Sequence, residues 1–488
     1  MSAKPIKMPT LLEAWLPVAS LIAMLAGSVY LFGDSSSSGP NQIALLLAAG
    51  VGIIIGLKNG HSWHQLQDGI VHGISLAMGA ILILLVVGSL IGTWILSGVV
   101  PTMIYYGLKI LNPTFFYPLA ALICAIAALA TGSSWTTAST VGVALIGIAT
   151  ALNLNPGIAA GAIISGSYFG DKLSPLSDTT NLAPAMAGAD LIDHIKHMLW
   201  TTVPSMIIAL IAYTIIGLVW PASGGFRGLE ATFTAIEQNF QIGWYLLIPP
   251  VLVITMLAKK IPALPALLIG ALAGAIFALL FQSAAIAQFV GETGFAAQIK
   301  GVWMALASGY KASTGNPAMN DLLSRGGMES MLNTTWLIIM AMTFGGVMDK
   351  TGILERIAQS ILGLVHSTGS LIASTLGTCI GMNIIAADQY ISIVLPGRMY
   401  RAEFERRTLA PQNLSRTLED AGTITSPMIP WNTCGAFMAT TLGVATLTYA
   451  PFCFLAILNP VIAAIYGYTG FTIKKNEDAS MTGDAEKA

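Results

Sequence analysis

The sequence predicts an all-α polytopic membrane protein made of two inverted-topology repeats with discontinuous transmembrane helices. The first observation is composition: 55% of the 488 residues are apolar and only 9% are charged, whereas soluble domains carry about 25% charged residues. The second is a pair of polar segments at membrane depth, and the third is the different charge of the loops inside them. At about 20 apolar residues per crossing, the length allows on the order of ten to a dozen spans.

Composition also excludes several kinds of protein. A net charge of −1 provides no basic surface for nucleic acid. The four cysteines lie in apolar stretches without a CxxC pair, which predicts buried thiols rather than disulfides or a zinc site. The sequence contains no phosphate-binding loop, dinucleotide fingerprint or nucleophile elbow. We therefore expect neither an enzyme nor a cofactor, and no transition-metal site.

The charge of the loops orients the chain in the membrane. The first apolar stretch, 11–32, is too long for a signal-peptide core and is expected to be retained as a span. Two lysines precede it and none follows in 33–41, so the N-terminus is predicted to be cytoplasmic. Two lysines in the polar tail 471–488 place the C-terminus on the same side. Both ends inside require an even number of crossings.

Hydropathy divides the chain into five parts. These are a cytoplasmic N-terminal segment with the first span and outer loop (1–41), transmembrane repeat 1 (42–221), a linker (222–241), transmembrane repeat 2 (242–470) and a polar cytoplasmic tail (471–488). Candidate spans lie near 11–32, 42–57, 72–98, 114–130, 137–151, 197–220, 242–258, 262–282, 333–349, 369–385, 386–397 and 436–469. The last stretch is long enough for two crossings, so the count is open by two.

Two segments are unusually polar for a membrane interior. The first, 131–181, opens with TGSSWTT and ends with GDKLSPLSDTTN. The second, 381–433, opens with GMNIIAADQY and ends with EDAGTITSPMIPWNT. Each closing block places a Ser-Pro step shortly before an asparagine. An interval of 39 residues separates a glycine from an aspartate in both segments, Gly132 from Asp171 and Gly381 from Asp420.

The loops inside the two segments differ in charge. Residues 153–157 carry no charge, whereas 398–416 carry five arginines. Because basic loops stay cytoplasmic, the first loop is predicted outside and the second inside. Equivalent loops on opposite sides indicate inverted repeats, in which a binding site lies near the membrane midplane between the halves. The alternative is that polar interruptions arose twice for packing.

Prolines are expected to break the helices of both segments, because each removes a backbone donor. Unpaired backbone in lipid is tolerated only where protein or a water-filled cavity surrounds it. Short half-helices should therefore meet near the midplane, with carbonyl ends that coordinate cations and amide ends that attract anions. The prolines are Pro175, Pro184, Pro427 and Pro430.

Neutral oxygen side chains surround the predicted breaks. A hard monovalent cation such as Na+ needs several such oxygens, and the low ligand charge argues against a divalent cage. The same side chains could serve only as helix-packing contacts. The expected Na+ ligands are Ser133, Ser134, Ser177, Thr179, Thr180 and Asn181 in the first half and Thr425, Ser426, Asn432 and Thr433 in the second.

Carboxylates at this depth are functional hypotheses by default. Asp178 is the first candidate because it lies inside the densest oxygen cluster. Asp171 is the second, unless an ion pair with Lys172 makes it structural. Asp388 is the candidate of the second half.

Other ionisable groups have two interpretations each. Glu419 and Asp420 follow the arginine-rich loop and either belong to the site or pair with Arg416 at the interface. His194 and His197 lie three residues apart, a spacing more typical of interfacial histidines than of a zinc site, which would need a third ligand. A role as pH sensor is the alternative.

These residues predict a secondary active transporter that exchanges Na+ for H+. Burial disfavours the charged form of a carboxylate, whereas bound Na+ stabilises it, so one carboxylate holds either a proton or a sodium ion. The alternative is a Na+- or H+-coupled carrier of a small organic acid or amino acid. An organic anion would favour a cationic pocket, and Lys172 is the one obvious buried candidate. A membrane enzyme or a channel is the third class.

The stretch GDKLSPLSDTTNLAP at 170–184 closely resembles the signature of the NhaC family of sodium/proton antiporters, and TGSSWTT at 131–137 matches that family as well. The resemblance implies a multi-pass protein in the lipid bilayer of a bacterial or archaeal inner membrane that transports Na+ and H+. It also implies paired re-entrant hairpins, two unwound helices, a homodimer and elevator-type movement. Similarity to superfamily sites points to 177–181 and 430–433 as ligand segments. Some relatives resemble exchangers of malate for lactate with sodium, so the alternative stays open.

Overall fold

The computed structural model describes residues 6–32, 36, 38–220, 229–314, 320, 323–363 and 365–476. Within these ranges every regular element is a helix, and one isolated bridge between Leu409 and Lys475 is the sole β-type pairing. Nine helices of this part are long and apolar enough to cross a membrane, or up to eleven if each of two bent pairs is one span. The prediction of an all-α polytopic membrane protein is confirmed. Parts of the predicted outer loop, linker and tail lie outside the described residues.

The first half of the chain contains most of the predicted spans. Its helices are α1 (Leu11–Phe32), α2 (Pro40–Lys58), α3 (Trp63–Leu96), α4 (Val99–Ile110), η2 (Pro113–Phe115), α5 (Phe116–Thr131), α6 (Ser134–Thr137), η3 (Ala138–Gly142), α7 (Val143–Ala151), α8 (Pro156–Leu173), α9 (Asp178–Ala187), α10 (Leu191–Val219) and α11 (Leu229–Asn239). The sequence analysis did not predict α8 as a span.

The second half contains shorter and more broken helices. They are η5 (Trp244–Leu247), α12 (Ile248–Ala258), α13 (Ala263–Phe281), α14 (Ser283–Val290), α15 (Phe295–Ala307), η6 (Met328–Met331), α17 (Leu332–Lys350), α18 (Ile353–Leu362), α19 (Thr368–Ile385), α20 (Gln389–Arg406), α21 (Pro411–Leu418), η7 (Glu419–Thr423), η8 (Ser426–Met428), α22 (Thr433–Leu442), α23 (Thr446–Tyr449), η9 (Ala450–Phe452) and α24 (Phe454–Thr469). The span predicted at 386–397 is wrong in its bounds, because these residues form a break and the start of α20.

The two halves share an internal repeat with a constant offset of 255 residues. N-cap residues recur at this interval, as do residues with positive φ in the left-handed region. The predicted register, which paired Gly132 with Gly381, is therefore six residues out. The N-cap pairs are Ser133 and Asp388, Asn155 and Ala410, and Ser177 and Asn432. The positive-φ pairs are Gly132 (68°) and Ala387 (58°), Asn153 (52°) and Thr408 (53°), and Gly188 (76°) and Gly443 (69°).

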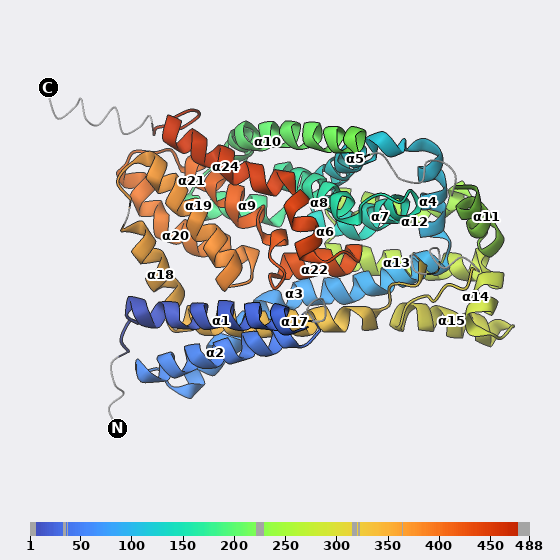
Figure 1. Ribbon diagram of the computed structural model, residues 1–488, viewed down its shortest axis with the longest axis horizontal. Helices are drawn as coiled ribbons and strands as arrows, with labels where there is room; N and C mark the ends of the chain where they lie inside the picture. The colour runs from blue at the N-terminus through green and yellow to red at the C-terminus, as the bar shows by residue number, and fades with distance from the viewer. Residues whose placement is uncertain are drawn as a thin grey trace.

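The two repeats run in opposite directions. The loop between α7 and α8 lies beside the start of α5, where the N–H of Asn155 donates to Tyr117 Oη at 3.2 Å. The loop between α20 and α21 lies beside the C-terminal segment, where the N–H of Ala410 donates to the carbonyl of Lys474 at 3.0 Å. In Figure 1, α7 lies toward the right, whereas α20 and α21 lie at the left with the start of α1 and the end of α24. The inverted arrangement follows from these positions.

Small residues let helices of the first repeat pack backbone to backbone. A Cβ atom at Gly166 would lie 2.0 Å from the carbonyl oxygen of Ala121, and one at Gly170 would lie 2.2 Å from that of Ala125. These contacts hold α8 against α5, an arrangement typical of membrane helices, where glycine allows close approach. The four cysteines are free and buried, as predicted.

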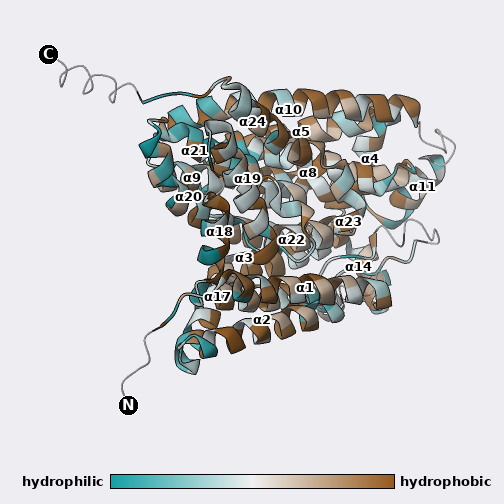
Figure 2. Ribbon diagram, turned by 60° about the vertical axis from the view of Figure 1, so that its left-hand side comes forward, coloured by the Kyte–Doolittle hydropathy of each residue, from teal (hydrophilic) through white to brown (hydrophobic). Residues whose placement is uncertain are grey.

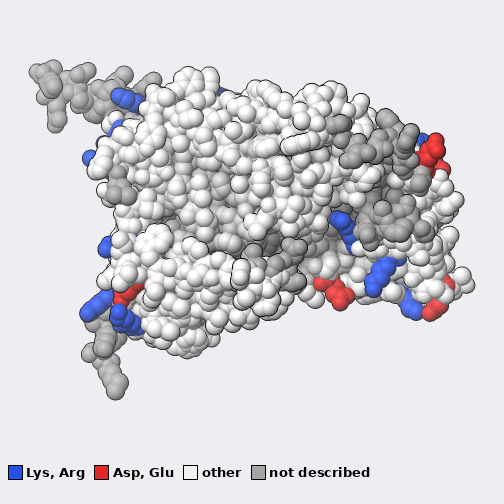
Figure 3. All heavy atoms as spheres, in the orientation of Figure 1, with Lys and Arg blue, Asp and Glu red and all other residues white. Residues whose placement is uncertain are grey.

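The surface is divided between apolar flanks and charged ends. Figure 2 shows α10 as a mostly hydrophobic helix, with hydrophilic residues gathered around α18, α20 and α21. On the face shown in Figure 3, charged side chains gather toward the two ends of the long axis, and the surface between them is almost free of charge. Large apolar side chains are exposed along α10, including Ile207, Ile211 and Ile215. Such a band suits contact with lipid.

Candidate functional site

Four helix N-termini begin at the breaks of the two repeats, and each has a side-chain cap. Ser133 Oγ accepts from the N–H of Thr136, and Ser177 Oγ accepts from the N–H of Thr180. In the second repeat, Asp388 caps α20 and Asn432 caps α22 in the same manner. These caps satisfy backbone donors that the broken helices leave without a helical partner. The residues of the polar segments thus form the breaks themselves.

The breaks of the two repeats meet at one pocket of about 710 Å³. Its other wall consists of 76–83 of α3 and the loop 259–262 between α12 and α13. Eight of the thirteen predicted site residues line the pocket. Its polar lining includes Ser133, Ser134, Asp171, Ser177, Asp178, Thr179, Asp388, Gln389, Tyr390 and Thr433.

Asp171 is the buried carboxylate of the first repeat, with 8% of its surface exposed. Its Oδ2 accepts two hydrogen bonds from Ser134, from the backbone N–H at 3.0 Å and from Oγ at 2.6 Å. The opening motif of the first polar segment is thereby joined to its closing motif. The ion pair considered between Asp171 and Lys172 does not form, because Lys172 bonds elsewhere.

Asp388 is the buried carboxylate of the second repeat, with 3% of its surface exposed. Its Oδ1 accepts from the N–H groups of Tyr390 at 2.9 Å and Ile391 at 3.1 Å. Its Oδ2 lies 3.4 Å from Thr433 Oγ1. Each repeat therefore contributes one buried aspartate that accepts bonds at a helix start.

Asp178 lines the same pocket but is exposed. It is the first residue of α9, directly after the Ser177 cap. The sequence reasoning expected a desolvated group here, and the structure instead gives the buried positions to Asp171 and Asp388. Within the described ranges no three acidic, histidine or cysteine side chains converge on one point. A cation in the pocket would therefore take one carboxylate together with neutral oxygens.

The remaining predicted ligands lie behind the pocket wall and hold the broken ends. Thr180 Oγ1 donates to the carbonyl of Lys172 at 3.0 Å, and Thr425 Oγ1 donates to that of Ala421 at 2.6 Å. The other bonds of this set are Asn181 Nδ2 to Ser177 O at 2.7 Å, Ser426 Oγ to Thr423 O at 2.7 Å and Asn432 Nδ2 to Asn383 O at 3.1 Å.

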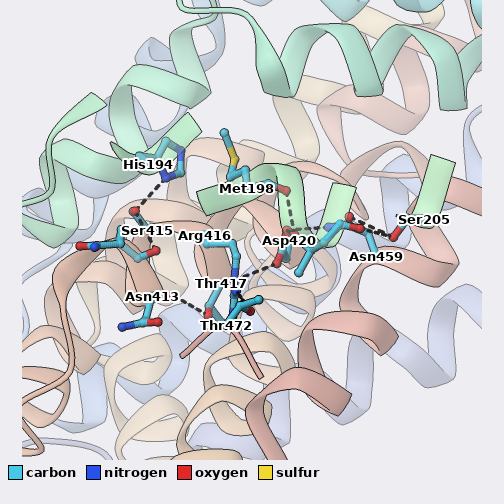
Figure 4. Close-up of polar contacts among 12 residues, drawn as sticks. His194, Met198, Ser205, Asn413, Ser415, Arg416, Thr417, Asp420, Asn459 and Thr472 are labelled. Atoms are coloured by element: carbon cyan, nitrogen blue, oxygen red, sulfur yellow. Dashed lines mark hydrogen bonds and ion pairs between the residues drawn. The ribbon is translucent and has the colours of Figure 1, made fainter. Parts of the chain in front are cut away.

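A buried ion cluster lies next to the site. Lys172 Nζ forms an ion pair with Asp420 Oδ1, and neither side chain is exposed. Arg416 Nε lies 3.7 Å from Asp420 Oδ2, and Thr201 Oγ1 and Asn459 Nδ2 donate to Oδ1 at 3.0 and 2.7 Å. Figure 4 shows Asp420 between Arg416 and Asn459. The interpretation of Asp420 as a partner of Arg416 is supported, although the pair is buried rather than interfacial.

Three nearby groups differ from expectation. His194 and His197 are buried rather than interfacial, and His194 Nδ1 lies 2.7 Å from Ser415 Oγ. Glu419 does not pair with Arg416, and its two buried carboxylate oxygens have no hydrogen-bond partner among the described residues. These groups were placed wrongly because α10 packs against α21, a contact between segments distant in sequence.

Sequence reasoning missed two residues that line the pocket. Tyr390 follows the Asp388 cap directly, and Lys260 lies in the loop between α12 and α13. Tyr390 could have been found from its position next to the cap. Lys260 served only as a marker of membrane orientation, because that loop lies outside both polar segments.

Comparison with known proteins agrees with this arrangement. A family model described as "Na+/H+ antiporter family" matches residues 166–471. The Na+/H+ antiporter NhaC of Alkalihalophilus pseudofirmus is 39% identical over 90% of this chain and 91% of its own length. The malate-2H+/Na+-lactate antiporter of Bacillus subtilis is 38% identical, with 96% of each chain covered. The arginine/ornithine antiporter ArcD of Halobacterium salinarum is 38% identical over 99% of this chain and 97% of its own.

These relatives are antiporters with different named solutes, and none is named as an enzyme. The family match extends over more than half of the chain and includes Asp171, Asp178 and Asp388. On these grounds the chain is a multi-pass membrane protein that belongs to the Na+/H+ antiporter family.

Proposed function

We propose that this protein exchanges Na+ for H+ across the cell membrane. The observation that carries the proposal is the meeting of two inverted repeats at one pocket, where each repeat supplies a buried aspartate at a broken helix. Buried carboxylates within membrane proteins mark ion and proton pathways. Broken helices at the junction of inverted repeats are where secondary transporters bind their ions.

Asp171 is the best-placed carboxylate for the exchange. Both of its hydrogen bonds from Ser134 go to Oδ2, so Oδ1 is available to a cation. Hydroxyls of Ser133, Ser177 and Thr179 line the same pocket and can supply neutral oxygens. Sodium and a proton both neutralise the carboxylate, and each excludes the other. A site that is loaded with Na+ on one side and with H+ on the other therefore performs antiport.

Asp388 and Asp178 have separate proposed roles. Asp388 is buried and accepts N–H bonds at the start of α20, which suits a second cation or proton position related to the first by the repeat. Asp178 is exposed on the pocket wall, which suits attraction of a cation before it is desolvated. The neutral ligands of the second half act with Asp388 in this scheme.

The acidic lining disfavours an organic anion as the transported solute. Three carboxylates line the pocket and Lys260 is the one basic residue among the lining residues in the described part of the chain. Lys172, the cation considered for such a solute, is engaged with Asp420. The names of the malate/lactate and arginine/ornithine relatives keep an organic solute as the alternative that the experiment must address.

Orientation and assembly remain predictions. The start of α1 and the end of α24 lie at one end of the molecule (Figure 1), and the lysines of the tail favour the cytoplasm for that end. A homodimer is proposed from family resemblance alone. Cysteine accessibility from either side of the membrane would test the orientation.

Proteoliposomes with an internal pH-sensitive dye test the function. An imposed sodium gradient should move protons without any organic solute. Vesicles without the protein and vesicles with potassium in place of sodium are the controls. Proton movement that appears only when malate, lactate or arginine is added would replace Na+/H+ exchange with the organic-solute alternative.

A further inference from the structure

A single lysine faces the acidic pocket from outside the two repeated segments. Lys260 belongs to the loop between α12 and α13, whereas the repeat extends over 112–190 and 367–445. Its neighbours Ile261 and Pro262 line the pocket as well, together with the middle of α3. The loop therefore forms a wall opposite the broken helices.

The backbone holds Lys260 in an unusual conformation. Its φ of 64° lies in the left-handed region, where glycine is the usual residue after a helix. Its N–H donates to the carbonyl of Leu257 at 2.8 Å, and the N–H of Ile261 donates to that of Met256 at 3.0 Å. These bonds terminate α12 and fix the point from which the lysine side chain projects.

Lys260 shares the pocket with three carboxylates without binding any of them directly. In the described part of the chain no ion pair within 4.0 Å joins Lys260 to Asp171, Asp178 or Asp388. Its positive charge therefore neutralises none of the three by contact. It acts on all of them through the electrostatic field, in a space of low dielectric constant where charges interact over the width of the pocket.

We propose that Lys260 is a specificity-determining residue that sets the cation affinity of the pocket: its fixed charge repels Na+, weakens binding and promotes release. This inference rests on the proposed exchange of Na+ for H+. Three carboxylates without a counter-charge would hold a cation too firmly for turnover. A lysine tethered outside the repeats offsets that attraction without occupying a ligand position.

The size of the effect follows from the pocket. A volume of about 710 Å³ corresponds to a width of roughly 10 Å. At an effective dielectric constant of about 40, loss of one unit charge at that distance changes cation affinity by roughly fourfold. Added salt screens such an interaction within a Debye length of about 10 Å at 0.1 M. The effect should therefore shrink as ionic strength rises.

Lys260→Gln tests the proposal, and Lys259→Gln is its matched control. Lys259 is the adjacent residue of the same loop but does not line the pocket. The full chain is assayed in proteoliposomes for the KM of Na+, and in detergent for equilibrium binding of radioactive sodium. K260Q should lower both constants roughly fourfold at low salt, whereas K259Q and Lys260→Arg should match the wild type.

Lys260→Gly separates charge from backbone conformation. Glycine suits a φ of 64°, so this variant remains folded if glutamine is not tolerated, and it too lacks the charge. It should bind Na+ as tightly as K260Q. Similar tightening in K259Q, or unchanged affinity in both K260Q and K260G, would overturn the role of Lys260.

The outcomes separate this inference from the proposed function. If the wild type moves protons with sodium but K260Q and K260G have wild-type sodium affinity at low salt, the inference alone fails. If the wild type neither binds sodium nor exchanges it, both fail. Tighter binding that persists unchanged in high salt would also overturn an electrostatic role, because screening must reduce it.

Discussion

Removing the acid of the buried ion cluster should destabilise the protein more than removing its lysine. Asp420 is the one carboxylate that pairs with both Lys172 and Arg416. Asp420→Asn keeps the shape but leaves two buried cations without their acid. Breaking a buried pair by removing one partner costs about 3–5 kcal/mol, because the other charge stays buried without compensation.

Lys172→Met should cost less. Asp420 keeps Arg416 at 3.7 Å and keeps the hydrogen bonds from Thr201 and Asn459 at 3.0 and 2.7 Å. The loss is then one charge-assisted hydrogen bond, about 1.5–3 kcal/mol. The double variant K172M/D420N should be less destabilised than the sum, with a coupling of about 0.5–3 kcal/mol.

Thermal or denaturant unfolding of the purified full chain in detergent measures this order. Lys300→Met is the control, since Lys300 pairs with Glu292 at 2.8 Å on the surface and such pairs contribute about 0–1 kcal/mol. A K172M variant that unfolds as readily as D420N, or a strictly additive double variant, would show that the pair is not the main support of the cluster. Retained stability in all three variants would refute the reasoning.

Three further predictions concern the site and its packing. Asp171→Asn and Asp388→Asn should each abolish sodium-driven proton movement, and near-normal exchange in either would remove that carboxylate from the mechanism. Asp178→Asn should raise the KM of Na+ and leave the maximal rate similar, because the side chain is exposed at the pocket wall; an unchanged KM contradicts its role in cation attraction. Acidification should raise the KM of Na+ toward tenfold per pH unit, because the ligand must be deprotonated, and a flat profile argues against competition. Gly170→Ala should lower stability by about 1–3 kcal/mol, since its Cβ would meet the carbonyl of Ala125 at 2.2 Å, and an unchanged unfolding midpoint would contradict the close packing.

Much of the fold could be predicted because lipid imposes a simple length rule. Helices such as α1, α2 and α13 appear in the sequence as continuous apolar runs. Helix α8 was missed because it is buried in protein rather than lipid. It can therefore carry glycine, serine and an ion pair in place of apolar side chains, and hydropathy alone does not reveal such a helix.

The site could be predicted in part from the same polar segments. The residues that gather at the pocket come from the motifs that break the helices, and the inverted loops follow from their charge. The repeat register was wrong because a glycine-to-aspartate interval is a weaker marker than the cap residues and left-handed turns that recur at 255. The partner of Lys172 lies 248 residues away in the chain, and only the tertiary fold brings the two together.

The seam between α5 and α8 has a mechanical consequence. With glycine at Gly166 and Gly170 the two backbones touch, and there is no room for one rod to slide or tilt against the other. Asp171 and the serine that holds it therefore travel as cargo fixed to a stiff frame. Any change in which side of the membrane the pocket faces must come from displacement of that whole frame along α3 and the α12–α13 loop, rather than from bending within it.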